Sequence, residues 1–393
     1  MRRIPVAPRP GWRQLAARLG FRHHTTALGA YWCEEACFQF DVAEIESDLR
    51  PAIEAVWSLC LAVMERASRD DEILSSLGIP EAGWDPLRES WERRDPTLCT
   101  RFDFAYGDGG PPKLHECNAD APGVLYESAA FQWIWLEDRL DHGVIAREGD
   151  QFNRIHQALV EAFAGLPSPR QPIHFTASRL NIEDQVWAAY LRDCAHQAGR
   201  PTGFVATEEI GVDRRGRLCD LDARLITHLV KAYRWELLLR EEFGPHIAGA
   251  GAPMVLEPLW KLVLSSKGIL VWLWRLFPDH PNLLPCWFED EPAAPTGRCV
   301  VKPLFSVKGR NIRLCDPTLP GGRVSTSGPY GREGHVVQAL HRLATFARPG
   351  GESHASVTGW IVAGRAEGIG VLESDGPVID DETCRFVPHV VLG

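Results

Sequence analysis

The sequence predicts a mixed α/β (α+β) fold with a helical N-terminal region and a mainly β C-terminal lobe. Three observations support this: apolar residues at helical spacing over 41–68, short strands alternating with a helix from Pro172, and strand-like runs after Arg298. A chain of 393 residues rarely folds around one compact core. We therefore expect one unit, residues 1–393, with lobes around a shared cleft that span approximately 1–150, 151–250 and 251–393.

The first 150 residues contain the signals of an arm and two helices. Asp41 is a candidate N-cap for a helix over 41–68, and residues 126–140 form a second helical segment whose aromatic side chains suit packing between lobes. The first 22 residues contain six arginines and no acid, a composition that transit peptides share. Three prolines in the first ten residues interrupt any early helix, which favours an ordered, arginine-rich arm.

The remaining elements change from mixed to mainly β along the chain. In the middle section we expect strands at 173–176 and 203–206 and helices at 183–198, 222–243 and 258–276. After Arg298 we expect strands at 299–302, 311–314, 335–339, 356–362 and 369–372, separated by glycine-rich turns.

Composition argues against several classes of protein. Asp and Glu number 52 against 42 Lys and Arg, and the net charge of -10 argues against a general nucleic-acid binder. The most apolar stretch, 254–277, contains four charged residues, so we expect no membrane-spanning helix and no membrane partner. Eleven scattered cysteines without paired spacing are typical of reduced, buried thiols, which predicts a cytoplasmic protein.

Residues 100–118 predict a β-hairpin with a six-residue loop at 107–112. Pairing of Tyr106 with Lys113 sets the register, and alternation then sends four polar side chains to one face. In that register Arg101 lies opposite Asn118, and Asp103 lies opposite Glu116.

The chemistry of this face indicates a metal and a phosphate. Two facing carboxylates repel each other and need a cation, and the oxygens of Asp103, Glu116 and Asn118 suit Mg²⁺. Arg101 beside them suits phosphate oxygens. The alternative is a solvated hairpin face on which the arginine and the acids only pair with one another.

Only six of the 42 basic residues are lysines, so a retained lysine is a candidate for a phosphate contact. Lys302 ends an apolar strand, and the loop after it, through Lys308 and Gly309, has a length that suits folding over phosphates. Lys267 begins an apolar helix and points either into a cleft or to the surface. The apolar strand 336–341 either borders a purine or belongs to the core.

Together these segments resemble the synthetase domain of glutathionylspermidine synthase and, more closely, the short stand-alone bacterial members of that family known as acid–amine ligases. The resemblance covers nearly the whole chain. Beside the hairpin, it rests on motifs in the same order: Arg9-Pro10-Gly11-Trp12, Tyr31-Trp32-Cys33-Glu34, Phe131-Gln132-Trp133-Ile134-Trp135-Leu136-Glu137, Glu257-Pro258-Leu259-Trp260-Lys261, Phe277-Pro278, Pro281-Asn282-Leu283-Leu284-Pro285 and Val301-Lys302-Pro303.

The resemblance implies a permuted ATP-grasp fold that uses ATP and Mg²⁺ to join a carboxylate to an amine through an acyl phosphate. The implied Mg²⁺ ligands are Asp103, Glu116 and Asn118, and the implied catalytic residue is Arg101, at the transferring phosphoryl group. The implied nucleotide contacts are Arg101, Asp103, Lys267, Lys302, Lys308 and Gly309, with Gln338, Ala339, Leu340 and His341 at the adenine. The implied substrate contacts are Glu183 and Asp184, near a polyamine and a peptide.

The sequence also departs from the family pattern. Val307 and Leu372 stand where relatives carry arginines, Ala121 occupies the stretch of a glutathione-contacting serine, and the amidase domain of full-length synthases is absent. We therefore expect a peptide or amino-acid carboxylate and a polyamine such as spermidine as substrates, without assigning glutathione or hydrolysis. The alternative is a catalytically weakened relative that serves as a nucleotide- or polyamine-binding module. The complete hairpin set and both nucleotide lysines favour the ligase.

Overall fold

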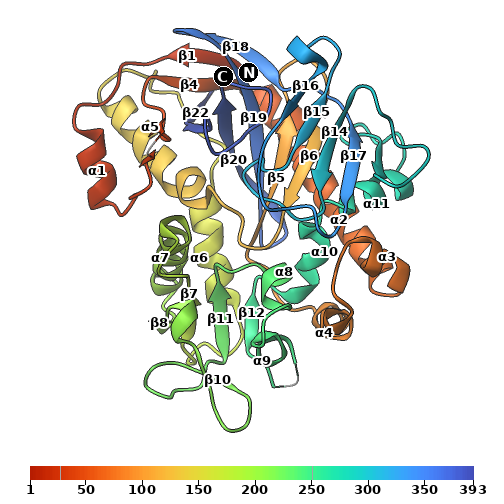
Figure 1. Ribbon diagram of the computed structural model, residues 1–393. Coiled ribbons are helices and arrows are strands. Elements are labelled where there is room, and N and C mark those ends of the chain that lie inside the picture. Colours follow the sequence, from red (N-terminus) through yellow and green to blue (C-terminus); the bar gives the residue numbers. More distant parts are fainter. Residues whose placement is uncertain (27, 250) are drawn as a thin grey trace.

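The computed structural model describes residues 1–26, 28–249 and 251–393, and three sheets of this part carry most of its fold (Figure 1). A six-stranded antiparallel sheet has the order β21-β20-β19-β5-β6, with β18 also paired to β19. Its strands are β5 (Cys99–Ala105), β6 (Lys113–Asn118), β18 (Ala344–Arg348), β19 (Gly351–Val362), β20 (Arg365–Ser374) and β21 (Arg385–Val387). The hairpin near residue 100 thus shares a sheet with the last fifty residues.

Helix α2 (Arg50–Ala67) packs on this sheet through its apolar stripe. Gly359 in β19 permits the close approach, because a Cβ there would lie 2.4 Å from Cγ1 of Ile53 on α2. The prediction of one helix over 41–68 needs a correction at its start. Residues Glu44–Leu49 form a π-helical stretch, and Asp41 ends strand β4 (Ala36–Asp41) instead of capping the helix.

A five-stranded antiparallel sheet of order β13-β17-β14-β15-β16 lies beside the hairpin (Figure 1). Its strands are β13 (Cys286–Phe288), β14 (Cys299–Pro303), β15 (Arg313–Cys315), β16 (Arg323–Ser325) and β17 (His335–Ala339). Side chains of β14 and β17 reach the hairpin: Lys302 donates to the His115 carbonyl at 2.7 Å, and Gln338 donates to the Leu114 carbonyl at 3.0 Å. The predicted strands of the C-terminal section are confirmed, but β19 begins five residues and β20 four residues earlier than predicted, and β16, β18 and β21 were not predicted.

The third sheet is parallel and has the order β12-β11-β7-β8. Its strands are β7 (Ile173–Thr176), β8 (Thr202–Phe204), β11 (His228–Lys231) and β12 (Met254–Leu256). Helix α7 (Ile182–Gln197) packs on β7 and β8, and α6 (Ile155–Gly165) packs on α7 and reaches β7 through the contact of Phe163 with Phe175. The predicted helix over 222–243 is wrong. The apolar run His228–Lys231 is a fully buried strand, and only α8 (Trp235–Leu238) and α9 (Gly244–Ala248) are helical nearby.

The predicted helix over 258–276 is interrupted. A single 3-10 turn (Leu259–Lys261) leads into α10 (Leu262–Ser265), and α11 (Ile269–Leu276) starts only after a break. The break has a tertiary cause, because the Lys267 N–H donates to the Leu304 carbonyl at 2.8 Å and not to a helical carbonyl. Lys267 therefore leaves the helix axis at the point where β14 ends.

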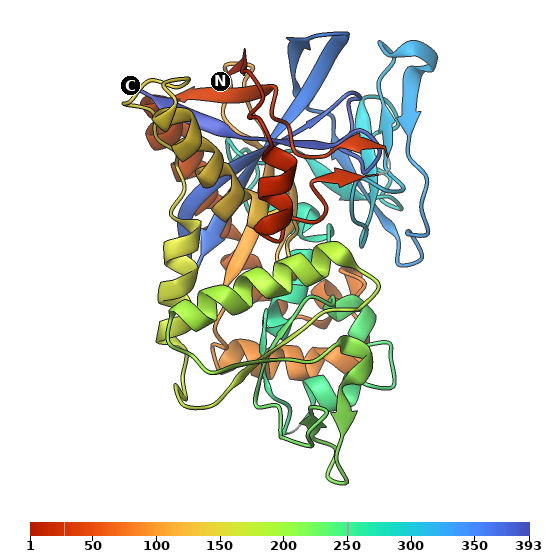
Figure 2. The same ribbon diagram turned by 90° about the vertical axis from the view of Figure 1, so that its left-hand side faces the viewer.

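The N-terminal arm is ordered, as predicted. Strand β1 (Arg2–Pro5) pairs with β4, which also pairs with β22 (His389–Leu392), and Arg9 forms a buried ion pair with Glu34. Figure 2 shows the arm, in red, crossing between α7 and the C-terminal strands. The second predicted helix is confirmed as a π-helical turn (Glu127–Phe131) followed by α5 (Gln132–Asp141).

The remaining elements of the described chain are short. They are α1 (Trp12–Arg18), β2 (Thr25–Thr26), β3 (Gly29–Ala30), α3 (Asp71–Ser76), α4 (Trp84–Glu92), β9 (Gly211–Val212) and β10 (Leu218–Cys219). In the described residues, no helix has the length and apolar character needed to cross a bilayer. The cysteines carry free thiols, and eight of them are buried.

Candidate active site

The hairpin brings its four polar side chains together as the sequence predicted. Asp103 lies opposite Glu116, and Arg101 lies opposite Asn118. The predicted pairing of Tyr106 with Lys113 is wrong, because Ala105 takes that place. A register shift next to Asp103 leaves one extra residue in β6, and this bulge restores the pairing of the two acids.

Each carboxylate of the hairpin has its own cation. Arg101 donates from Nε and Nη2 to the two oxygens of Asp103, at 2.8 and 2.9 Å, and Asn118 adds a hydrogen bond of 3.1 Å. Glu116 instead pairs with Lys267, whose Nζ lies 2.8 Å from Oε1. The facing acids are therefore held by two cations from different parts of the chain.

The two acids differ in their electrostatic environment. Burial raises the pKa of Asp103, and the negative charge of Glu116 raises it further. Together these two effects outweigh the lowering by Arg101. Burial also acts to raise the pKa of Glu116, but the ammonium of Lys267 and its hydrogen bond outweigh it, so the pKa is lowered. A cation near Asp103 would relieve the repulsion between the two carboxylates.

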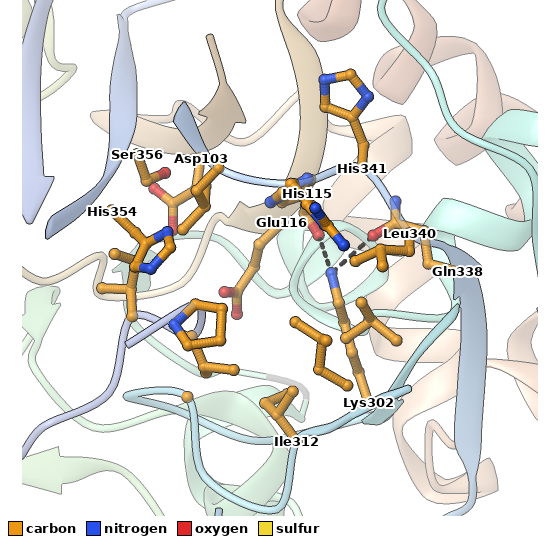
Figure 3. Close-up of a pocket in the computed structure, with 18 of the residues that line it drawn as sticks. Asp103, His115, Glu116, Lys302, Ile312, Gln338, Leu340, His341, His354 and Ser356 are labelled. Atoms are coloured by element: carbon orange, nitrogen blue, oxygen red, sulfur yellow. Dashed lines mark hydrogen bonds between the residues drawn. The ribbon is translucent and has the colours of Figure 1, made fainter. Parts of the chain in front are cut away.

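Lys302 reaches the same region from β14. Its Nζ donates to the His115 carbonyl and to Oε1 of Gln338, both at 2.7 Å, and Figure 3 shows it aimed at them with Glu116 nearby. Burial lowers the pKa of Lys302 to about 8. Its ammonium is thus held in place by two hydrogen bonds, and it loses its proton as the pH rises through about 8.

A cavity of about 340 Å³ lies between the five-stranded sheet and the hairpin (Figure 3). Apolar side chains such as Ile312, Leu314 and Leu340 line it together with the two lysines and the two hairpin acids, and Asp316, Arg342 and Glu352 add further charges. The predicted nucleotide contacts that line it are Asp103, Lys267, Lys302, Gly309, Gln338, Ala339, Leu340 and His341. A cavity that combines apolar side chains with ammonium groups suits a nucleotide base with its phosphates.

A second, larger cavity of about 860 Å³ lies on the other side of the hairpin acids. The predicted site residues that line it are Arg101, Asp103, Glu116, Asn118, Lys267, Lys308, Gly309, Glu183 and Asp184. The two cavities share a wall made of Asp103, Glu116, Lys267, Gly309, Leu372 and Ile379. All the predicted site residues therefore line one of two cavities that meet at the hairpin carboxylates.

The acids of α7 lie at its first turn in the larger cavity. The side chain of Asn181 caps the helix by accepting from the backbone N–H groups of Glu183 and Asp184, at 3.1 and 3.3 Å. Burial, together with the neighbouring Glu183, raises the pKa of Asp184 to about 6. Glu183 pairs with Lys308, with 2.6 Å between Oε1 and Nζ.

The replaced arginine positions both lie at the cavities. Val307 lines the larger cavity, whereas Leu372 is buried in the shared wall. Lys308 lines the larger cavity, but it is not among the described residues that line the smaller cavity.

Sequence reasoning missed part of the larger cavity. His23 and Tyr31 of the arm line it, and Nε2 of His23 lies 2.9 Å from Glu127. Arg234, paired with Glu236, and the loop 375–385 also line it. Hydrophobic periodicity does not predict a role for these residues, because they lie mainly in irregular segments. The motif that begins at Tyr31 was the one sequence feature that indicated this region.

The donor set for a metal consists of two carboxylates and one amide. In the part of the chain that the structure describes, no group of three or more His, Cys, Asp or Glu side chains is arranged as a metal site. Mg²⁺ in nucleotide sites is usually held by one or two carboxylates together with substrate phosphates. The facing carboxylates of Asp103 and Glu116 fit that requirement, whereas Asn118 turns its Nδ2 toward Asp103 and would present its Oδ1 only after rotation of the amide.

Comparisons with known proteins agree with this architecture. A family model described as glutathionylspermidine synthase preATP-grasp matches residues 3–392. The chain is 32% identical, over 99% of both chains, to a Haemophilus influenzae protein named "Putative acid–amine ligase". It is 29% identical, over 75% of its own length, to the bifunctional glutathionylspermidine synthetase/amidase of Escherichia coli, of which it spans 50%.

The fold is similar to that of a glutathione synthetase-like effector from Globodera pallida, with a TM-score of 0.53 and 13% identity, covering 91% of this chain and 89% of that one. The family model and the relatives define an enzyme of the acid–amine ligase class. The chain belongs to the glutathionylspermidine synthase family.

Proposed function

We propose that the chain is an ATP- and Mg²⁺-dependent carboxylate–amine ligase with a permuted ATP-grasp fold, acting as one unit with the three lobes given above. It joins a peptide or amino-acid carboxylate to a polyamine such as spermidine through an acyl phosphate. The observation that carries the proposal is the wall shared by the two cavities, which contains both hairpin acids and Lys267. A phosphoryl group transferred at this wall would be within reach of both cavities.

The smaller cavity is the nucleotide site in this proposal. The apolar side chains hold the base, and the backbone of residues 338–341 borders it. Lys302 and Lys267 come from different elements, and both point their ammoniums at the hairpin end of the cavity. Two fixed cations there would stabilise the charge that grows on the phosphates during transfer.

The hairpin oxygens of Asp103, Glu116 and Asn118 would hold Mg²⁺. The ion would neutralise phosphate charge, which lets an anionic carboxylate approach the nucleotide. Arg101 lies on the side of the larger cavity, where its guanidinium is fixed by Asp103 and by the Gly123 carbonyl at 2.9 Å. A fixed guanidinium in this position suits the oxygens of the phosphoryl group in transit.

The larger cavity holds the two substrates that are joined. The carboxylate oxygen attacks the γ-phosphorus and ADP leaves; the neutral amine then attacks the acyl carbon, and inorganic phosphate leaves with the C–O bond broken. Eleven acidic residues line this cavity against six lysines and arginines. This excess of negative charge favours a cationic acceptor such as a polyamine.

A second candidate function is a nucleotide- or polyamine-binding module. Val307 and Leu372 favour it, because they line the cavities at positions where relatives carry arginines, so this chain lacks both guanidinium groups there. The complete hairpin set and both lysines favour catalysis, since binding alone needs only part of that set.

ADP release separates these two functions. The protein is mixed with Mg·ATP and pooled amino acids and small peptides, with and without spermidine. A ligase releases ADP over many turnovers only when carboxylate and amine are both present, and Asp103→Asn slows this release by about thirty-fold to a thousand-fold. Nucleotide binding without ADP release under any combination would support the binding module instead.

A further inference from the structure

An ion pair between Lys308 and Glu183 connects the loop after β14 to the start of helix α7. Lys308 belongs to the loop 306–310 that follows β14, and Glu183 lies in the first turn of α7. Their side chains are 45% and 43% exposed and lie in the larger cavity. The ion pair therefore lies in the larger cavity and connects the loop to α7.

The backbone of this loop is fixed independently of Lys308. Lys267 donates to the Ser306 carbonyl at 2.8 Å, Thr326 donates to the Gly309 carbonyl at 2.5 Å, and Arg310 pairs with Asp381. Gly309 has a φ of +63° and packs so closely that a Cβ would lie 2.3 Å from the Ile379 carbonyl oxygen. The Lys308 side chain is thus the part of the loop that is free to exchange partners.

The ammonium of Lys308 is chemically the same as one end of a polyamine. It ends a flexible alkyl stem and donates to a carboxylate in a cavity rich in acids. Exposed ion pairs of this kind contribute little net free energy, so an ammonium from solution can replace the lysine easily. The next residue, Gly309, lines both cavities, so a released Lys308 is close to the wall that they share.

We propose that Lys308 occupies, in the free protein, the position that a substrate ammonium takes against Glu183, and that acceptor binding releases Lys308 toward the nucleotide phosphates. The inference rests on the proposed function and deepens it in two respects. It gives Glu183 one ammonium of the acceptor as its partner, and it couples acceptor binding to nucleotide binding through Lys308. Because the coupling is an equilibrium property, it acts equally in both directions.

The test measures this coupling without requiring turnover. The affinity of the intact protein for a Mg²⁺ complex of a non-hydrolysable ATP analogue is measured by calorimetry with and without saturating spermidine. In the wild type, spermidine should tighten analogue binding about two- to five-fold, the range expected for releasing one exposed ion pair. Spermidine affinity should rise by the same factor when the analogue is present.

Two variants should remove the coupling for opposite reasons. In Glu183→Gln, Lys308 is already free, so the analogue should bind tightly without spermidine, and spermidine itself should bind more weakly. In Lys308→Met, the competitor is gone, so spermidine should bind more tightly and the analogue more weakly. Glu161→Gln and Arg179→Met are the matched charge controls, because each removes one charge from an exposed ion pair outside both cavities, and both should keep the coupling.

The possible failures can be told apart. If wild-type protein binds both compounds without coupling, or if coupling persists in Lys308→Met, the inference is overturned while the proposed function stands. If the charge controls lose the coupling as well, the effect is general electrostatics and the inference is again overturned. If the wild type binds neither compound, the proposed function fails and the inference fails with it.

Discussion

At the scale of single residues, Asp103 holds the hairpin face together through its two hydrogen bonds from Arg101 and one from Asn118. Its pKa is raised, so the folded protein disfavours the charged form of this side chain. Asparagine keeps one acceptor oxygen for Arg101, so Asp103→Asn should lose part of this pairing and reduce stability less than activity, because it removes the charge that Mg·ATP needs.

Asp103→Asn is accordingly expected to lower turnover by about thirty-fold to a thousand-fold, the cost of one missing charge contact in the transition state. Its midpoint of thermal unfolding should change by only a few degrees. Calorimetry with Mg·ATP should show weakened binding in this variant. Wild-type affinity for Mg·ATP would show that Asp103 does not belong to the metal site.

Lys302 gives the site a dependence on pH. Burial lowers the pKa of its ammonium to about 8, so in the free protein the charge is present below that pH and is lost above it. A bound phosphate favours the charged form and raises the pKa, so nucleotide binding near pH 8 should take up a proton. Affinity should fall as the pH rises above 8.

Calorimetry in two buffers with different ionisation enthalpies measures this uptake directly. At pH 8 the wild type should take up part of one proton with the nucleotide, whereas Lys302→Met should bind more weakly and lose that uptake. Equal proton uptake in both proteins would place the titrating group elsewhere.

At the scale of elements, the approach of α2 to β19 depends on Gly359. Gly359→Ala would bring a Cβ to 2.4 Å from Ile53, so we expect a loss of about 1–3 kcal/mol in the free energy of unfolding. Urea denaturation measures this loss, and in the double variant with Ile53→Ala the total loss should be smaller than the sum of the two single losses. Gly165→Ala is the control, because a Cβ there meets nothing within 4 Å. Equal stability of both single variants would contradict the packing argument.

The elements also show how far the sequence alone could lead. The pairing of Asp103 with Glu116 was predicted correctly, but the loop register on which the prediction relied is wrong, and only the bulge restores this pair. The bulge was not predictable, since it depends on how the hairpin joins β19 and the five-stranded sheet. The helix break at Lys267 comes from a hydrogen bond to Leu304, 37 positions along the chain. The hydrophobic periodicity of residues 258–276 cannot predict such a distant contact.

At the scale of the whole molecule, the central feature is the meeting of two cavities at one pair of acids. In the smaller cavity the sequence identified the hairpin acids, the two lysines and residues 338–341, because strand patterns and the scarcity of lysine mark them. It missed much of the larger one, since His23, Tyr31 and the loop 375–385 are brought there only by folding of the arm and the C-terminal strands. The account therefore depends most on whether the two cavities serve one reaction.

Transfer of an oxygen label tests that claim most directly. A carboxylate substrate found by ADP release is enriched in ¹⁸O in its carboxyl group and incubated with Mg·ATP and spermidine, and the inorganic phosphate is examined by mass spectrometry. Attack of the carboxylate on the γ-phosphorus transfers one carboxyl oxygen to phosphate, so each amide formed should yield one phosphate containing one ¹⁸O. Amide product accompanied by unlabelled phosphate would exclude the acyl phosphate and contradict the account.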